Sequence, residues 1–285
     1  MPGENYLKSI QNYWRVYSGI NKKSKIKCRE FLSFFINTDE YPLTELNNIR
    51  DSETAKIIEN SYRAVNISFI EEWSKFCSPN NIDLISILDS IRLRPTHNNI
   101  MRPGLGVGGY CLTKDPLMGE VSQKQVFKSK KSNFNFCKKA ITINRKMPIS
   151  TLNDCKPLLI DKKKTNCLIL GFTYKENIAD TRHSASEILA NELKKIYLQV
   201  LVYDPMLKKI NLKKYHLIQS IEKIEVPIDS IFLTVKHEEF LTKKFLHYLE
   251  KSKASIFDFN CVLSREKILY LQNKGSTVFS KGMSL

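Results

Sequence analysis

The segment PGLGVGGYCLTKD, residues 103–115, carries the residue types best suited to covalent chemistry. Glycines at positions 104, 106, 108 and 109 precede Cys111, and Lys114 and Asp115 follow it. Glycine lets a backbone adopt positive φ angles or approach a ligand closely. If a helix begins near Cys111, its N-terminus and the Lys114 ammonium would favour the nucleophilic thiolate. The alternative is a flexible glycine loop with a buried, inert cysteine.

A second candidate lies on a long helix predicted over residues 52–73. Lys56, Asn60 and Arg63 recur at i, i+4 and i+7, so they share one polar face of that helix. A lysine and an asparagine on such a face can donate hydrogen bonds to an alkoxide or a tetrahedral oxyanion. The alternative is an ordinary solvated face, on which Glu59 and Arg63 can pair at i, i+4.

The third candidate is GFTYKENIADTRHS, residues 171–184, between a predicted strand and a predicted helix. In open α/β sheets, ligands bind at this end of the strands. Lys175 and Arg182 suit a phosphate or a carboxylate. The glycine pattern of this segment is not that of a dinucleotide-binding turn. By itself the segment indicates a generic anion site.

Hydrophobic periodicity predicts the elements that must position these residues. The N-terminal part reads as a short α/β segment with a strand in 14–20 and a helix over 25–36. Three helices follow, over 52–73, 82–91 and 134–146, the last stopping near Pro148. From about residue 152 the pattern changes to buried strands and one helix, with strands in 166–172, 199–205, 229–235 and 254–259 and the helix over 184–196.

We therefore predict an α/β protein with a helical central domain, a Rossmann-like α/β domain after it, and a short α/β remnant at the N-terminus. The predicted boundaries are 1–50 for the remnant of a dinucleotide-binding domain, 51–151 for the helical central and dimerisation domain, and 152–285 for the Rossmann-like domain.

Composition narrows the class of protein. The 285 residues are 42% hydrophobic and 26% charged, as in a globular protein. The seven cysteines are scattered without a CxxC pair, which argues against a disulfide framework or a metal site and fits a reducing cytoplasm. We expect no signal peptide and no membrane span, because neither a basic-then-apolar N-terminus nor an 18-residue apolar run occurs.

The formal charge of +16 comes from short lysine runs spread along the chain. We interpret them as a solvated surface and expect no nucleic-acid partner. A nucleic-acid face is the alternative, and salt-dependent binding to random DNA would test it.

The three candidate segments, in this order, resemble the UDP-glucose/GDP-mannose dehydrogenase superfamily. GVGGYCLTKD is similar to that family's nucleophile segment, and AKIIENSYRAVNI to the helix that carries its active-site lysine and asparagine. LILGFTYKENIADTRHSAS followed by VYDP is similar to the start of its nucleotide-sugar-binding domain. INRKMP and DSIFLTVKHEEF are weaker echoes. The resemblance covers essentially the whole chain.

The resemblance implies oxidation of the C6 alcohol of a nucleotide sugar to a carboxylate, in two NAD-dependent hydride transfers through a cysteine thiohemiacetal and a thioester. It implies Cys111 as nucleophile, Lys56 and Asn60 as oxyanion-stabilising groups, and Asp115 as an assistant to water or proton transfer. The implied substrate-contacting residues are Lys114, Gly108, Arg94, Lys175 and Arg182, the last two also contacting the cofactor and Arg94 reaching a neighbouring subunit's site.

The implied partners are a nucleotide sugar and a second copy bound through the helical domain. A UDP-sugar is preferred, and UDP-glucose, UDP-N-acetylglucosamine, UDP-N-acetylmannosamine and GDP-mannose stay open. The family's role implies polysaccharide biosynthesis in the cytoplasm.

Two departures from the family accompany this resemblance. The family begins with a Rossmann domain that bears a phosphate-binding glycine turn and, later, an acidic catalytic base. We expect this chain to lack most of that domain and to bind NAD poorly. His183 also stands where many members have glutamate. The alternative function is therefore a non-catalytic nucleotide-sugar-binding or dimerisation module.

Overall fold

The computed structural model describes residues 6–129, 133–159, 163–207 and 214–284. Its backbone divides into two compact units, one of residues 1–63 and 114–135 and the other of residues 64–113 and 136–285. The division falls within helix α3 (Ile49–Cys77), which contributes to both units. The three-domain boundaries predicted from the sequence stay a prediction.

The first unit contains a parallel βαβ arrangement. Strands β1 (Val16–Tyr17) and β2 (Thr44–Glu45) pair in parallel, and helix α2 (Lys22–Phe35) connects them. Helix α2 begins three residues earlier than predicted because Asn21 and Ser24 form a capping box. The unit also holds α1 (Tyr6–Gln11), the 3-10 helix η3 (Asp115–Leu117) and α5 (Met118–Gln125). The N-terminal region therefore has the predicted α/β character.

The helices of the second unit lie before and after the glycine-rich segment along the chain. They are the second half of α3, α4 (Leu84–Arg92) and α6 (Asn135–Asp154), with short 3-10 turns η1 (Ser78–Asn80), η2 (Pro95–His97) and η4 (Lys156–Leu159). The predicted end of α6 near Pro148 was wrong, since the helix runs on to Asp154. Proline removes one helical hydrogen bond, but Met147, Pro148 and Leu152 are buried, and their packing keeps the helix intact.

A six-stranded parallel sheet forms the rest of the second unit. Its order is β5-β4-β3-β6-β7-β8, which is 3-2-1-4-5-6 counted from its own first strand. The strands are β3 (Asn166–Leu170), β4 (Gln199–Tyr203), β5 (His216–Leu217), β6 (Ile228–Leu233), β7 (Ser255–Asp258) and β8 (Val278–Ser280). This is the doubly wound order, so the predicted Rossmann-like domain is confirmed. Its switch point, where such folds bind ligands, lies between β3 and β6.

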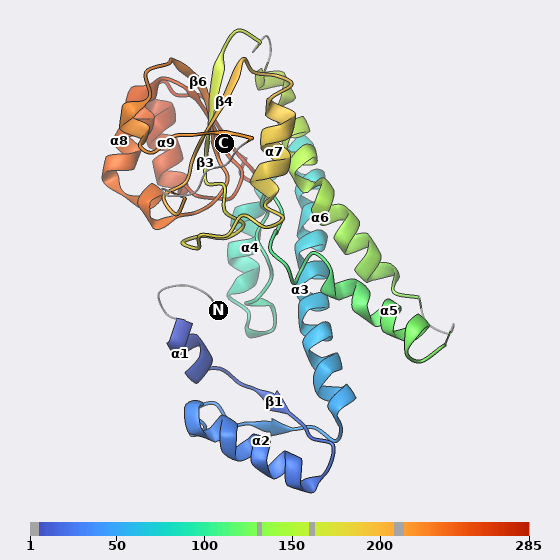
Figure 1. Cartoon of the computed structure of the whole chain (residues 1–285). Coiled ribbons are helices and arrows are strands. Elements are labelled where there is room, and N and C mark those ends of the chain that lie inside the picture. The colour runs from blue at the N-terminus through green and yellow to red at the C-terminus, as the bar shows by residue number, and fades with distance from the viewer. Residues whose placement is uncertain (1–5, 130–132, 160–162, 208–213, 285) are drawn as a thin grey trace. The chain divides into compact units, whose positions relative to one another are not determined.

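Helices cover both faces of this sheet, as Figure 1 shows. Helix α7 (Ala185–Leu193) packs on one face, where Cys167 and Ile169 of β3 point. Helices α8 (Lys243–Ser252) and α9 (Arg265–Asn273) pack on the other, where Leu168 and Leu170 point. The uninterrupted apolar run of β3 is explained by this two-sided burial. Short 3-10 turns η5 (Ile221–Lys223) and η6 (Glu238–Leu241) complete the unit.

Candidate active site

The glycine-rich loop of the second unit is fixed by side chains from distant elements. The side-chain amide of Asn144, on α6, makes two hydrogen bonds to the backbone of Val107. Its Nδ2 donates to the Val107 carbonyl at 2.7 Å, and its Oδ1 accepts from the Val107 N–H at 2.8 Å. Asn260, beyond β7, accepts from the Leu105 N–H at 2.8 Å. Gly106 has φ +108, a conformation that strongly favours glycine. The loop therefore has defined side-chain partners for its backbone at Leu105 and Val107.

This loop packs directly on the loop of residues 171–184. The Gly109 N–H donates to the Arg182 carbonyl at 2.9 Å. A Cβ atom on Gly109 would lie 2.9 Å from the Tyr174 ring, and one on Gly108 would lie 2.4 Å from the His183 carbonyl oxygen. The structure thus brings together two of the predicted signals that are far apart in the sequence. Packing accounts for the glycine at 108, so a substrate contact there stays a prediction.

Cys111 follows this loop in an exposed turn. No helix begins at Cys111 itself: the next helical residues are Asp115 in η3 and Met118 in α5. The alternative of a buried cysteine is wrong, because Cys111 is exposed, and the reactivity of its thiol stays a prediction. Burial instead distinguishes other cysteines, raising the pKa of both Cys155 and Cys261 to about 12.

The first unit holds a buried polar cluster around Asp115. The Asn60 Nδ2 donates to Asp115 Oδ2 at 2.8 Å, and the Lys114 ammonium donates to Asp115 Oδ1 at 2.7 Å. Asn60 and Asp115 are 3% and 9% exposed. Because a carboxylate only accepts hydrogen bonds, the Asn60 amide must present its nitrogen, and this bond uses one of its two hydrogens. Three predicted site residues therefore form one cluster.

The Lys56 side chain, unlike that buried cluster, is largely exposed. Its ammonium is 3.1 Å from Glu59 Oε2, and both side chains are largely exposed. Glu59, which by spacing could pair with Arg63, thus accepts from Lys56. The polar face of α3 therefore combines a buried amide, Asn60, with an exposed ion pair one turn before it.

A buried carboxylate and imidazole anchor the loop of residues 171–184. Asp204, which follows β4, accepts from the N–H groups of Phe172 at 2.6 Å and Thr173 at 2.8 Å, and from His237 Nε2 at 3.0 Å. His237 Nδ1 accepts from the Asn177 N–H at 3.0 Å, so its proton must sit on Nε2. Burial alone would raise the pKa of Asp204, but these hydrogen bonds outweigh burial and lower it.

The cations predicted to bind a ligand differ in their surroundings. Arg182 is exposed and forms a forked pair with Asp180, from Nε to both carboxylate oxygens at 3.1 Å and from Nη2 at 2.7 Å. These bonds hold the pKa of Asp180 below its usual range. Lys175 lies half-buried in the same loop, whereas Arg94 lies in an exposed turn of the second unit. An anionic ligand of Arg182 must compete with Asp180.

Sequence reasoning missed the anchoring residues Tyr174, Asn260 and Asp204. Two others lay within segments noted only as weak echoes: Asn144 in INRKMP and His237 in DSIFLTVKHEEF. A polar residue just after a buried strand, or at an inward helix position, is the signal that could have identified them.

The described residues do not fit the pyrophosphate of NAD. A dinucleotide turn needs clustered glycines between the first strand and the helix that follows it. After β3 the only glycine before α7 is Gly171, whose Cβ would lie 2.5 Å from Val235. Gly104, Gly106 and Gly109 have the glycine spacing of such a turn, which sequence reasoning passed over. That stretch neither follows a strand nor begins a helix.

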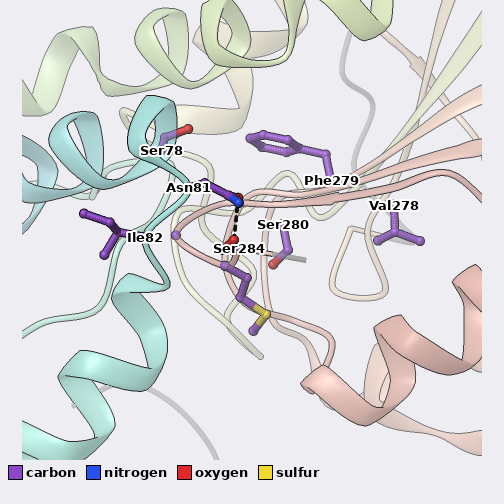
Figure 2. A pocket seen from close by; sticks show the side chains of 9 residues that line it. Ser78, Asn81, Ile82, Val278, Phe279, Ser280 and Ser284 are labelled. Atoms are coloured by element: carbon purple, nitrogen blue, oxygen red, sulfur yellow. Dashed lines mark hydrogen bonds between the residues drawn. The ribbon is translucent and has the colours of Figure 1, made fainter.

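The described ranges hold no group of three or more His, Cys, Asp or Glu side chains placed to bind a metal ion. No helix within them is long and apolar enough to cross a membrane. A pocket of 210 Å³, shown in Figure 2, lies between the turn at η1 and β8, and the predicted site residues do not line it.

Comparison with known families identifies two successive regions. Residues 50–146 match the central-domain model of the UDP-glucose/GDP-mannose dehydrogenase family, and residues 168–265 match the UDP-binding-domain model of the same family. The two matched regions contain the three predicted segments, in the predicted order.

Curated relatives and solved structures agree. A UDP-N-acetyl-D-mannosamine dehydrogenase of Methanococcus vannielii is 33% identical over 86% of this chain and 53% of its own length. This chain thus spans about half the length of the curated relatives it matches. A UDP-D-ManNAc dehydrogenase of Pyrococcus horikoshii has a TM-score of 0.76 at 23% identity, covering 100% of this chain and 63% of the other.

An NDP-N-acetyl-D-galactosaminuronic acid dehydrogenase of Methanosarcina mazei Go1 has a TM-score of 0.80 at 21% identity, covering 98% of this chain and 60% of the other. At these identities the solved structures show the shared fold. The two family models and the relatives show more, namely that this chain belongs to the UDP-glucose/GDP-mannose dehydrogenase family.

Proposed function

We propose that this chain takes part in oxidising the C6 alcohol of a nucleotide sugar, with Cys111 as the nucleophile. One observation carries the proposal: the Gly109–Arg182 hydrogen bond joins the loop before an exposed cysteine to the loop that holds Lys175 and Arg182. The second loop follows β3, at the switch point of the sheet, where doubly wound folds bind their ligands.

The thiol step of the proposal is a nucleophilic addition. The Cys111 thiolate attacks C6 of an aldehyde intermediate, an S–C bond forms, and the carbonyl π electrons move to oxygen. Lys56 and Asn60 are assigned to stabilising that oxyanion. Hydride loss then leaves a thioester, and Asp115 takes a proton from the water that displaces the thiolate. Oxidation needs a hydride acceptor, and the family implies NAD in that role.

The proposed ligand is a UDP-sugar. The sequence matches a UDP-binding-domain model, and the Methanococcus vannielii relative is named a UDP-N-acetyl-D-mannosamine dehydrogenase. Lys175 and Arg182 are assigned to anionic or polar groups of the ligand or cofactor, and Lys114, Gly108 and Arg94 to the substrate. Asp180 acts in this account as the anion that the ligand displaces from Arg182.

A homodimer through the helical region is the proposed assembly. Phe69, Trp73 and Phe76 lie at steps of four and three on α3 and are all exposed. Their rings contact edge to face, with centroids 6.3 and 5.8 Å apart. An exposed aromatic stripe on a long helix is typical of a surface that a partner covers. A second copy would also allow Arg94 to reach a neighbouring site.

Titration calorimetry with UDP, UDP-glucose and UDP-N-acetylhexosamines tests the binding part of the proposal. We expect measurable binding that weakens as salt is added, because charge attraction contributes. Circular dichroism on the same sample checks that the chain is folded. Failure of all these ligands to bind the folded chain would contradict the proposed function.

The alternative function is a non-catalytic nucleotide-sugar-binding module. The observation that favours it is the poor fit of the described residues to a dinucleotide pyrophosphate. The two functions separate at Cys111: a binding module binds UDP-sugars but has no need of a reactive thiol. Ligand binding with an unreactive Cys111 would therefore favour the module.

A further inference from the structure

Lys281 is a fully buried lysine that directly follows β8. Its ammonium donates to Glu71 Oε2 at 2.6 Å, to Thr151 Oγ1 at 2.6 Å and to the Gly104 carbonyl at 2.9 Å. Lys281 and Glu71 side chains are 2% and 1% exposed. An ammonium has three hydrogens, so these three bonds use all of them. The contacts join α3, α6, the last strand and the start of the glycine-rich loop within one unit.

Stability alone does not explain this arrangement. Burial lowers the pKa of Lys281, and Glu71 opposes that shift. Buried ion pairs lose so much solvation that apolar residues of similar volume are often equally stable. Glu71 Oε1, although buried, makes no hydrogen bond among the described residues, and lies 3.9 Å from the Lys75 ammonium. The pair therefore does something that a packed apolar core would not.

The geometry shows what the ammonium holds. Gly282, the next residue, has φ +79, and a Cβ there would lie 2.5 Å from Pro103 Cγ. The chain from Lys281 to Gly282 thus contacts the loop at both Pro103 and Gly104. Its neighbours Ser280 and Gly282 line the pocket of Figure 2, whereas Lys281, Pro103 and Gly104 are not among the lining residues.

Side chains bond the peptide groups of the loop. The Gly104–Leu105 peptide is held at both ends, its carbonyl by Lys281 and its N–H by Asn260, and Asn144 holds the N–H and the carbonyl of Val107. Lys281 supplies the charged contact of this series, and a charged donor makes a stronger hydrogen bond than a neutral one. Its position is at the loop's first bonded peptide, ahead of Cys111.

We propose that Lys281, held by Glu71, is a positioning residue that fixes the backbone of the nucleophile loop through the Gly104 carbonyl. The proposal rests on the proposed function in one respect only, namely that Cys111 is the nucleophile that this loop presents. Lys281 itself touches neither substrate nor reacting atoms in this account.

Hydrogen exchange of the loop amides, in the full chain, tests the proposal with two variants that differ in one contact. Lys281→Met removes the donor to Gly104 but keeps an unbranched side chain that is only one heavy atom shorter. Glu71→Gln removes the counter-charge, yet even a neutral Lys281 amine keeps two N–H groups for its partners. Both variants leave one buried charge unpaired or shift its protonation, so both lose stability.

We expect the Leu105 and Val107 amides to exchange roughly tenfold faster in Lys281→Met, since a hydrogen bond from a charged donor is lost. In Glu71→Gln they should stay near the wild-type rate once global unfolding is subtracted. Lys267→Met is the matched control, because Lys267 donates to the Leu241 carbonyl, which belongs neither to this loop nor to its anchors. Wild-type exchange of both amides in a folded Lys281→Met would overturn the proposal.

A double variant protects the test against unfolding. Glu71→Leu with Lys281→Met replaces the pair by apolar side chains and should fold. Its loop amides should still exchange faster than in the wild type, and wild-type protection would overturn the proposal. The exchange readout does not depend on thiol chemistry, so an unreactive Cys111 would contradict the proposed function and leave this result standing.

Discussion

The two loops that meet in the second unit are held by different chemistry. Three side chains from distant elements fix the glycine-rich loop: the neutral amides of Asn144 and Asn260 and the ammonium of Lys281. One buried pair, Asp204 and His237, fixes the loop of residues 171–184. In both loops the anchors are buried or, for Asn260, partly buried, whereas the residues assigned to chemistry, Cys111 and Arg182, are exposed.

This comparison separates two kinds of polar residue. The anchors satisfy backbone groups that would otherwise be buried without partners, and removing one is costly. The exposed residues can be changed with little effect on folding, so their substitution reports on function. The predictions below use that difference.

The largest effect is expected for Asp204→Ala. It leaves two backbone N–H groups and the His237 Nε2–H without an acceptor in a fully buried site, at roughly 1–3 kcal/mol each, so unfolding in urea should show a loss of about 3 kcal/mol or more. Asp180→Asn is the matched control in the loop that Asp204 anchors, since its carboxylate pairs with an exposed arginine. A midpoint for Asp204→Ala equal to that of the control would contradict the anchoring role.

The same carboxylate predicts a pH dependence. The folded-state pKa of Asp204 is lowered from 3.8, so its contribution to stability is fully present above pH 3.8 and is lost as pH falls through the folded value. Unfolding free energies measured from pH 6 to pH 3 should therefore fall less in Asp204→Asn than in the wild type. A parallel pair of curves would contradict this assignment.

A smaller loss is expected for Asn144→Ala. Both hydrogen bonds to Val107 disappear, and two buried backbone groups lose their partner, which costs roughly 1–3 kcal/mol. Thr142→Ala, on the exposed side of the same helix, is the control. Urea unfolding compares the two, and limited proteolysis shows whether the loop is cut. Similar behaviour of both variants would mean that the loop does not need Asn144.

Substitution of Arg182 should weaken ligand binding and leave the stability of the fold unchanged. Arg182→Ala should leave the unfolding midpoint unchanged, because its pair with Asp180 is exposed. UDP-sugar affinity should fall roughly tenfold or more, and Arg182→Lys should recover only part of it, since a point charge lacks the planar fork. Asp180→Asn should raise the affinity by removing the competing anion. Unchanged affinity in all three variants would remove Arg182 from the site.

The smallest expected signal is for NAD. Because the described residues form no turn that fits its pyrophosphate, we expect calorimetry on this chain to show little or no heat of NAD binding. Micromolar affinity would show that the chain binds the dinucleotide in some other way.

The sequence predicted the helices α3, α4, α6 and α7 and the strands β3, β4, β6 and β7 at their places along the chain. The apolar run of β3 and the periodicity of α3 and α7 are local patterns, and each formed the expected element. Strands β5 and β8 have two and three residues, too few for a pattern to show. The end of α6 was misplaced because burial of Pro148 and its neighbours outweighs the local preference of proline.

In the candidate site, the sequence indicated the exposed residues that are assigned to chemistry, but it missed the residues that anchor their loops. Asn60 and Asp115 were both predicted, but their hydrogen bond depends on two distant segments meeting, which spacing cannot show. The glycines were attributed to a positive φ or to a ligand's close approach. Gly106 and Gly109 do have positive φ, while Gly108 and Gly109 also pack on the His183 carbonyl and Tyr174. Long-range contacts of this kind become visible only in the folded chain.

The rate at which Cys111 is alkylated, with and without a UDP-sugar, tests the central claim most directly. Peptide mapping at near-neutral pH gives the rates of all seven cysteines in one sample. We predict that Cys111 reacts fastest, ahead of the half-buried Cys28 and Cys137, and that a bound UDP-sugar slows Cys111 alone. Faster labelling of Cys28 or Cys137, or a Cys111 rate unaffected by a UDP-sugar shown to bind, would contradict the assignment of Cys111 as the nucleophile.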